Sequence, residues 1–295
     1  MQILPFENLA CPIDFEPLHG RVNPENGAIS YVCSHGHTFD AARQGYVNLL
    51  PSQFKHSKNP GDKKEMVNAR TAFLESGAYE PVLQALFETV HSYMSAAGKK
   101  CYTVIDAGCG EGYYTAKLAQ KLINEPICAD IGFLGYDISK EAVSAAAKRS
   151  KDISWAVATT ARMPVLTHGA DIVLCLFGFP VWAEFARVLR SGGCVVLIDA
   201  GPAHLIELRQ MIYDTVFEKE KSMRLHPGFD CIDSCAYQFR LKNLSGVQVE
   251  NLLKMTPHCY RMQKEKQQGV LANPPAQITL DFCVSVYAPS KKTNG

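Results

Sequence analysis

The stretch Tyr102–Tyr114, which reads Y-T-V-I-D-A-G-C-G-E-G-Y-Y, constrains the fold of this chain more than any other. Its apolar first half predicts a buried strand that ends at Asp106. Gly108, Gly110 and Gly112 follow at alternate positions, where the backbone can turn sharply and a ligand can approach it closely. Apolar residues at helical spacing come next. A strand, a glycine turn and a helix in this order open a nucleotide-binding βαβ unit.

The spacing of the glycines distinguishes a dinucleotide site from an S-adenosylmethionine site. A dinucleotide fingerprint reads G-x-G-x-x-G, whereas this pattern is D-x-G-x-G-x-G. It resembles the S-adenosylmethionine loop of class I methyltransferases. We therefore expect Asp106, Gly108, Gly110 and Gly112 to take part in binding S-adenosylmethionine.

A second acidic residue is expected at the end of the next strand, because one carboxylate there can accept both ribose hydroxyls of an adenosine. That strand is predicted at Phe133–Tyr136 and is followed by Asp137. Asp130 lies nearer to the glycine loop, but it precedes I-G-F-L rather than ending a strand. We therefore predict that Asp137 binds the ribose and that residues 124–130 form an insertion before the strand.

Strands and helices alternate through the rest of the core. Strands are predicted near residues 153–158, 171–177 and 191–199, with helices at 140–149 and 181–189. Such alternation implies a parallel sheet that binds its ligand at the carboxyl ends of the strands. Two antiparallel edge strands are expected near 237–241 and 277–287.

The first 48 residues have few helix signals and are rich in turn formers. They carry C-P-I-D, with Cys11 and Asp14, and Y-V-C-S-H-G-H, with Cys33 and His37, so they look like a zinc knuckle pair whose second cysteine is Asp14. Asp14 can be read as a carboxylate ligand of a Cys₂AspHis tetrahedron. Two alternatives stay open. His35 or His19 replaces Asp14, or the module holds no metal and is packed by apolar side chains alone.

A basic segment, residues 43–64, follows the module. It contains five lysines and arginines against one acid, which suits a loop that tracks phosphates, although a solvated linker has the same composition. Asp62 and Glu65 are predicted to form a capping box for a helix through Leu74, and a second helix is predicted over 80–96.

Composition limits the class of protein. With 47% hydrophobic and 20% charged residues, no apolar run long enough for a membrane span and no signal-peptide pattern, the chain reads as a soluble cytoplasmic protein. Its 11 cysteines, several of them in apolar strands, indicate reduced thiols rather than disulfides. A net charge of +1 means that any RNA-binding surface must be a local patch.

Taken together, these residues resemble the guanine-N1 methyltransferases that modify a hairpin loop of bacterial 23S ribosomal RNA. The resemblance covers nearly the whole chain, and the segment from the module into the first helix is far more specific than the glycine loop. The motifs are C-S-H-G-H-T-F-D-A-A-R-Q-G-Y-V-N-L-L-P, N-P-G-D, A-R-T-A-F-L-E-S-G-A-Y-E-P, D-A-G-C-G-E-G-Y-Y-T, G-P-A-H-L and M-T-P.

The resemblance implies methyl transfer from S-adenosylmethionine to guanine N1, a structural zinc, a module that helps to hold the 23S RNA hairpin, and a homodimer. It implies an α/β fold: a Rossmann-like class I methyltransferase domain with a seven-stranded mixed sheet and a small N-terminal zinc-ribbon-like module. Its zinc ligands match Cys11, Cys33 and His37, with Asp14 in place of a cysteine. Positions that line its cofactor pocket match Tyr79, Gly110, Glu111 and His204.

We expect three parts: the zinc-ribbon-like module over 1–48, a basic linker with two helices over 49–98, and the methyltransferase domain over 99–295. One departure from the family, besides Asp14, is Gly178-Phe179-Pro180 in place of an A-P pair after the fourth strand. No general base can be named. Two other functions remain: a small-molecule methyltransferase, which the basic segment and the module argue against, and an RNA-binding protein that has lost catalysis, which the departures permit.

Overall fold

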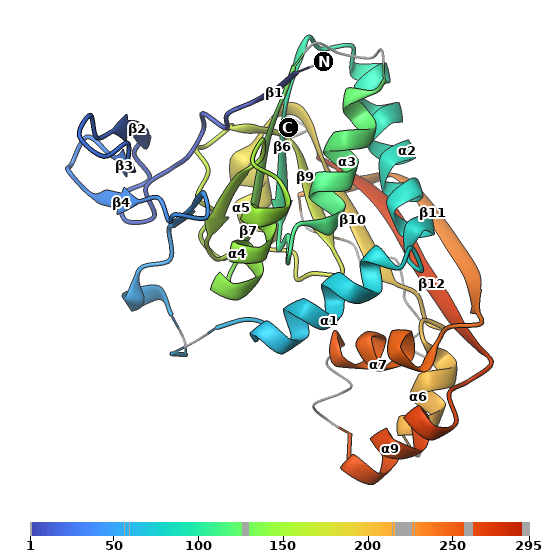
Figure 1. Cartoon of the computed structure of the whole chain (residues 1–295). Coiled ribbons are helices and arrows are strands. Elements are labelled where there is room, and N and C mark those ends of the chain that lie inside the picture. The colour runs from blue at the N-terminus through green and yellow to red at the C-terminus, as the bar shows by residue number, and fades with distance from the viewer. Residues whose placement is uncertain are drawn as a thin grey trace.

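The computed structural model describes residues 2–55, 57–58, 60–125, 130–213, 215, 226, 228–256 and 262–290. Within them, a large mixed sheet of nine strands forms the body of the molecule, in the order β11-β12-β10-β9-β6-β7-β8-β5, with β1 also paired to β7. A small sheet, β2-β3-β4, projects from one side of this body (Figure 1). An α/β fold with a small N-terminal module is thereby confirmed.

The strands of the large sheet are β1 (Gln2–Leu4), β5 (Tyr46–Asn48), β6 (Cys101–Ala107), β7 (Asp130–Asp137), β8 (Ser154–Val157), β9 (Ala170–Leu176), β10 (Leu189–Ala200), β11 (Phe229–Lys242) and β12 (Gln277–Pro289). Those of the small sheet are β2 (His19–Val22), β3 (Ile29–Val32) and β4 (Thr38–Asp40). The helices are η1 (Ser52–Phe54), α1 (Lys64–Glu75), α2 (Glu80–Ala97), α3 (Tyr113–Ile123), α4 (Lys140–Arg149), α5 (Trp182–Val188), α6 (Ile206–Ile212), α7 (Gly246–Lys254) and α9 (Lys264–Ala272).

Seven of the nine strands make the mixed sheet that was predicted. β6 to β10 pair in parallel, while β12 runs antiparallel to β10, and β11 antiparallel to β12. The residues of the central strands are buried on both faces, which explains why they read as apolar runs without alternation.

The other two strands, β1 and β5, add the N-terminal part of the chain to this sheet. β1 pairs in parallel with the first residues of β7, and β5 pairs in parallel with β8. Each has only three residues, too few to show a period in the sequence. The small sheet is therefore preceded in the chain by one strand of the large sheet, β1, and followed by another, β5. The division of the chain at residues 48 and 98 remains a prediction.

The sheet separates two apolar cores. Val104 and Ile172 point into one core, which is closed by α2, α3 and α4. Their neighbours Ile105 and Val173 point into the other core, which is closed by α5 and by the N-terminal segment. Cys11 and Cys33 belong to this second core and are almost fully buried. The module thus packs against the body of the enzyme fold rather than standing free.

The predicted capping box at the start of α1 is wrong. The N-cap residue is Lys63, and no side chain caps the helix. Asp62 instead forms an ion pair with Arg70 at 2.5 Å, and its carbonyl oxygen accepts a hydrogen bond from the Ser139 hydroxyl at 2.7 Å. These long-range contacts satisfy Asp62 and replace the local bond that the sequence pattern suggested.

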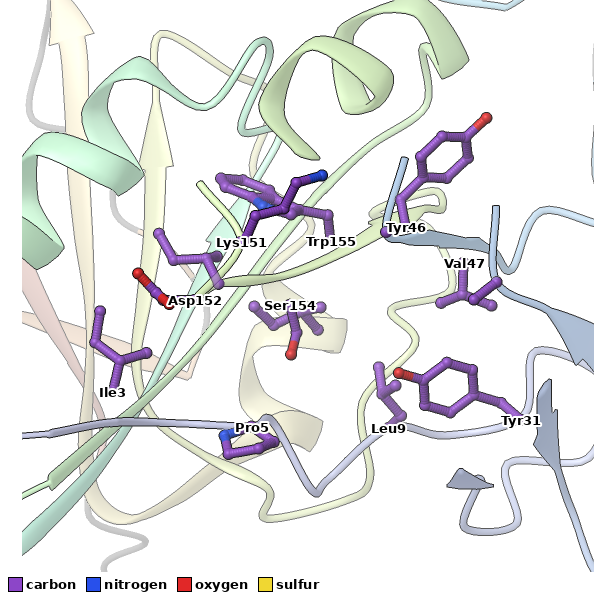
Figure 2. A pocket seen from close by; sticks show the side chains of 14 residues that line it. Ile3, Pro5, Leu9, Tyr31, Tyr46, Val47, Lys151, Asp152, Ser154 and Trp155 are labelled. Carbon is purple, nitrogen blue, oxygen red and sulfur yellow. The ribbon is translucent and has the colours of Figure 1, made fainter. Parts of the chain in front are cut away.

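A cavity of about 350 Å³ lies in the seam between β1, β5 and β8 (Figure 2). It exists because β1 pairs only with the beginning of β7 and β8 only with its end. Lys151, Ser154 and Tyr31 are among its lining residues. The Phe6 N–H donates to the Ser154 hydroxyl at 3.2 Å, and the Lys151 ammonium donates to the Gln44 carbonyl at 2.5 Å. These bonds close the seam.

In the part of the chain that the structure describes, no helix combines the length and the apolar character that a bilayer crossing requires.

Candidate cofactor pocket and metal centre

A cavity of about 730 Å³ opens at the carboxyl ends of the parallel strands. Loops that follow β6, β7, β8 and β9 form its inner wall, and residues of α1 and of the turn after α7 form the outer wall. Figure 1 shows α1 and α7 lying side by side below the sheet. Of the predicted cofactor residues, the cavity is lined by Tyr79, Asp106, Gly108, Gly110, Glu111, Asp137 and His204.

The glycine loop adopts a backbone that other residues rarely adopt. Gly108 and Gly110 have positive φ angles of 87° and 56°. The N–H groups of Gly108 and Cys109 both donate to the Tyr136 carbonyl, at 2.9 and 3.0 Å, which ties the loop to the end of β7. The loop is thus held in one conformation at the edge of the cavity.

Asp137 is the last residue of β7, whereas Asp130 is its first. Of these two carboxylates, only that of Asp137 lines the cavity. One of its oxygens accepts the Gly110 N–H at 3.0 Å, and the other accepts the Ser139 N–H at 2.8 Å. Burial raises the pKa of Asp137, although both hydrogen bonds oppose the shift. The carboxylate is oriented by these two bonds, and its oxygens have the capacity to accept further hydrogen bonds from a ligand.

Asp106 is almost fully buried at the end of β6. The Thr115 hydroxyl donates to its Oδ2 at 2.5 Å, and no group in the described residues bonds its Oδ1. Burial raises the pKa of Asp106 to about 7, against the effect of the Thr115 bond. A buried carboxylate oxygen without a partner at a cavity wall fits a cationic ligand group, and S-adenosylmethionine carries two.

Gly112 and Glu111 support the packing of the glycine loop against its neighbours. Gly112 does not line the cavity. A Cβ atom there would lie 2.7 Å from the Trp155 ring and 2.8 Å from Ala146, so the residue allows close helix packing. The Glu111 carboxylate, 1% exposed, accepts hydrogen bonds from Nε and Nη2 of Arg149 at 3.0 and 2.6 Å. This ion pair braces the glycine loop against α4.

Tyr79 and His204 contact each other in the wall of the cavity. His204 Nδ1 lies 2.8 Å from the Asp281 carbonyl oxygen, to which it donates, and the Tyr79 hydroxyl lies 3.3 Å from Nε2. Burial raises the pKa of Tyr79 above its ordinary value, so its hydroxyl remains protonated. The pair supplies a polar part of the cavity wall.

Sequence reasoning missed several residues of this cavity. Asp62 lies just before α1 and Arg70 in the middle of that helix, while Met255 and Thr256 follow α7. Arg70 links these two segments, since its guanidinium pairs with Asp62 and donates to the Met255 carbonyl at 3.3 Å. The N-P-G-D and M-T-P motifs contain Asp62, Met255 and Thr256, but the motifs alone did not indicate that these residues line the cavity.

The predicted metal ligands form one cluster. Cys11 and Asp14 come from a turn, and Cys33 and His37 from the loop between β3 and β4. Their donor atoms all lie within 4.8 Å of one another. His37 Nδ1 is 3.6 Å from Cys11 Sγ, 3.4 Å from Cys33 Sγ and 3.0 Å from Asp14 Oδ2.

These distances fit zinc. Ordinary zinc bonds to sulfur and nitrogen place two ligands of a tetrahedron about 3.5 Å apart. Burial raises the pKa of Cys11 to about 11, an unfavourable environment for a thiolate that a bound cation would reverse. Burial also opposes ionisation of Asp14, but bonds from Cys11 and His35 hold the pKa of Asp14 well below its ordinary value.

The two alternative ligands lie differently. His35 Nδ1 is 2.9 Å from the Asp14 carboxylate, and its side chain is 64% exposed, so it contacts a ligand from outside the cluster. His19 is an exposed residue of β2 and is not part of the cluster.

Two family models match the chain. Residues 9–58 match the N-terminal zinc ribbon domain of RlmA, and residues 104–193 match a methyltransferase domain. The first match contains all four clustered ligands, and the second contains the glycine loop and Asp137.

Relatives match the chain over most of its length. The 23S rRNA (guanine(748)-N(1))-methyltransferase of Streptomyces fradiae is 36% identical over 264 residues, covering 87% of this chain and 90% of the relative. YxjB of Bacillus subtilis, provisionally named a 23S rRNA (guanine-N(1)-)-methyltransferase, is 33% identical over 263 residues with the same coverage. The malonyl-[acyl-carrier protein] O-methyltransferase of Hamiltonella defensa, 29% identical, matches only 48% of this chain.

Two relatives are more than 30% identical to the chain and are covered over nine-tenths of their length. The two family models separately match the ribbon, where the four clustered side chains lie, and the methyltransferase core, where the glycine loop lines the cavity. The chain therefore belongs to the family of 23S rRNA (guanine-N1) methyltransferases.

Proposed function

We propose that this protein transfers a methyl group from S-adenosylmethionine to N1 of a guanine in 23S ribosomal RNA. The observation that carries the proposal is the presence, in one chain, of a cofactor-sized cavity at the large sheet and a ribbon with four clustered ligands. Relatives that match 87% of this chain are named for this activity.

The residues of the cavity suit this cofactor. Asp137 would accept the ribose hydroxyls, and Asp106 would face the cationic end. S-adenosylmethionine, when bound, would supply the methyl group: the N1–CH3 bond would form as the S–CH3 bond breaks, S-adenosylhomocysteine would be the leaving group, and the N1 proton would pass to water. The chain contributes orientation, because fixed positions of donor and acceptor lower the entropic part of the barrier. Leu74 and Met255 in the outer wall would exclude water.

The cluster of Cys11, Asp14, Cys33 and His37 would hold one structural zinc ion. The loops of the ribbon have few apolar residues of their own, so a metal would fix the turn at residues 11–16 and the β3–β4 loop. The ribbon would then present a rigid surface to RNA.

A hairpin loop is the proposed target. Guanine N1 takes part in Watson–Crick pairing, so only an unpaired and unstacked base can enter the cavity. Lys55, Lys58, Lys63 and Lys64 are exposed on the segment that leads from the ribbon to the cavity. They would contact phosphates of the hairpin stem.

We further propose a homodimer located in the cytoplasm, where ribosomal RNA is made. β11 lies at the end of the sheet, and its outer edge can add a strand. Ile232 and Phe239 on β11 are 57% and 39% exposed. Sedimentation of the purified protein, alone and with RNA, tests the oligomeric state.

The activity is tested with unmodified 23S rRNA transcribed in vitro. The purified protein and isotopically labelled S-adenosylmethionine should yield 1-methylguanosine after nuclease digestion and mass spectrometry. An Asp137→Ala variant serves as the control. If the protein binds S-adenosylmethionine but transfers no label to RNA, catalysis on RNA is excluded. Label that appears only in a small-molecule extract would favour the small-molecule alternative.

A further inference from the structure

We propose that Phe179 is the stacking platform for the target guanine. The inference rests on the proposed function and adds the residue that positions the base. No matched motif assigns a role to this residue, since it lies in the segment where the chain departs from the family pattern.

Phe179 is exposed to an unusual degree. Its relative exposure is 91%, whereas Val22 and Val247, the next most exposed large apolar residues in the described part of the chain, reach 66%. It also lines the cofactor cavity. Covering an exposed phenyl ring is favourable because it removes apolar surface from water, and this ring stands at a cavity that, under the proposed function, must admit a planar base.

The backbone before it is held in a rare conformation. Phe177 has a φ of 51°, in the left-handed region, and its N–H donates to the Ile198 carbonyl at 2.7 Å. The Phe177 ring lies 5.9 Å from the His204 ring and is tilted by 32°. One aromatic ring therefore anchors the loop against the cavity wall, and the other, two residues later, extends outward. Pro180 stiffens the chain directly after it.

The loop lies beside the glycine loop. β9 pairs in parallel with β6, with Leu174 opposite Asp106. A Cβ atom on Gly178 would lie 3.7 Å from the Ala107 carbonyl oxygen and 3.2 Å from Cys175 Sγ. Gly178 thus allows this loop to approach the end of β6, and Phe179 comes next in the chain. A base stacked on Phe179 would lie at the mouth of the cavity that contains Asp106.

Stacking suits this task chemically. An extruded base loses the stacking of its neighbours, and an aromatic side chain can replace it. Such a contact contributes a factor of about 5 to 150 per base. It leaves the Watson–Crick edge of guanine, including N1, available to the methyl donor.

The test compares Phe179→Ala, Phe179→Tyr and Phe179→Trp with the control Ile123→Ala, which truncates another exposed apolar side chain, at the end of α3. Steady-state kinetics use unmodified 23S rRNA transcribed in vitro, and calorimetry measures S-adenosylmethionine affinity. We expect Phe179→Ala to lower kcat/KM for RNA about 5- to 150-fold, with unchanged S-adenosylmethionine affinity. The Tyr and Trp variants should retain activity, and RNA should quench the added tryptophan fluorescence of Phe179→Trp relative to wild type.

The other outcomes distinguish a failure of the stacking proposal from a failure of the proposed function. If the wild type methylates 23S rRNA and Phe179→Ala is as active as Ile123→Ala, the stacking proposal is wrong while the proposed function stands. If Phe179→Ala loses S-adenosylmethionine affinity, the ring is part of the cofactor wall and the proposal is also wrong. If Phe179→Ala changes the sedimentation of the protein, the ring belongs to a protein interface instead. A wild type inactive on rRNA overturns the proposed function itself.

Discussion

The guanidinium of Arg162 lies 4.0 Å from the centre of the Phe15 ring. The guanidinium of Arg187 is 4.9 Å from the same ring, and Arg162 also donates to the carbonyl oxygens of Pro12 and Ile13. Phe15 follows the predicted ligand Asp14, and Arg162 follows residues 159–161, which line the large cavity. The turn that carries two of the predicted metal ligands is thus fastened directly to the wall of this cavity.

We predict that Phe15→Leu releases the ribbon from this wall. A cation–π contact of this kind contributes about 0.5–2 kcal/mol. Proteolytic cleavage within residues 12–40 should become about 2- to 30-fold faster when opening is rapid compared with cleavage. A double-mutant cycle with Arg162→Met should show coupling between the two residues. Additive effects of the two substitutions would mean that the ring and the guanidinium act separately.

Asp137→Ala should weaken S-adenosylmethionine binding by about 1–3 kcal/mol, because it removes a charge-assisted acceptor for the ribose. Asp130→Ala at the other end of β7 is the matched control and should leave the affinity unchanged. Isothermal titration calorimetry measures both. The assignment fails if Asp130→Ala, and not Asp137→Ala, reduces the affinity.

The affinity for S-adenosylmethionine should rise with pH. Burial raises the pKa of Asp106 to about 7, so the empty pocket holds a protonated carboxyl below neutrality. A ligand with net positive charge favours the ionised form, and binding below pH 7 must then release a proton. We expect the Kd to fall between pH 6 and pH 8, by no more than about tenfold per pH unit. Asp106→Asn should flatten this profile, and a wild-type Kd independent of pH would contradict the role of Asp106.

One zinc ion per chain is expected in the purified protein, bound by Cys11, Asp14, Cys33 and His37. A carboxylate is a harder ligand than a thiolate, so chelators should remove zinc faster from the wild type than from Asp14→Cys. Metal analysis by mass spectrometry and a chelator time course measure both quantities. A wild type without zinc beside a zinc-loaded Asp14→Cys would show that packing alone holds the ribbon.

Neutral substitutions at Lys55, Lys58, Lys63 and Lys64 should weaken RNA binding and make its salt dependence shallower. Each lysine that no longer neutralises a phosphate should lower the slope of log K against log salt by about 0.7 to 0.9. Cofactor affinity should not change. A control with neutral substitutions at Lys100 and Lys242, exposed residues at a strand start and a strand end, tests net charge alone. If the slope and methylation both survive, the segment is only a linker.

The catalytic domain was predictable from its sequence because local signals there agree with the tertiary structure. The helix after the glycine loop begins at Tyr113, directly after Gly112, and α4 has the bounds Lys140–Arg149 that were predicted. β7 ends at Asp137 as its apolar run suggests. The spacing of Cys11, Asp14, Cys33 and His37 also led to a cluster that the fold assembles.

Other features depend on contacts between distant residues and have no local pattern. The capping box at Asp62 was wrong because Arg70 and Ser139, one of them 77 residues away, satisfy that residue. The contact of Phe15 with Arg162 crosses the boundary between two modules, so neither sequence segment indicates it. The exposure of Phe179 follows from the turn at Phe177 and cannot be read from residue type.

The pairing of β5 with β8 also sets an order for synthesis on the ribosome. β2, β3 and β4 pair only with one another, within residues 19–40, so the ribbon can form soon after it emerges. Tyr46 of β5 must wait for Trp155 of β8, which is made roughly 5 to 20 s later at usual translation rates. The ribbon can therefore bind metal before the strands of the large sheet have been made. Its docking onto that sheet is then a separate, later step.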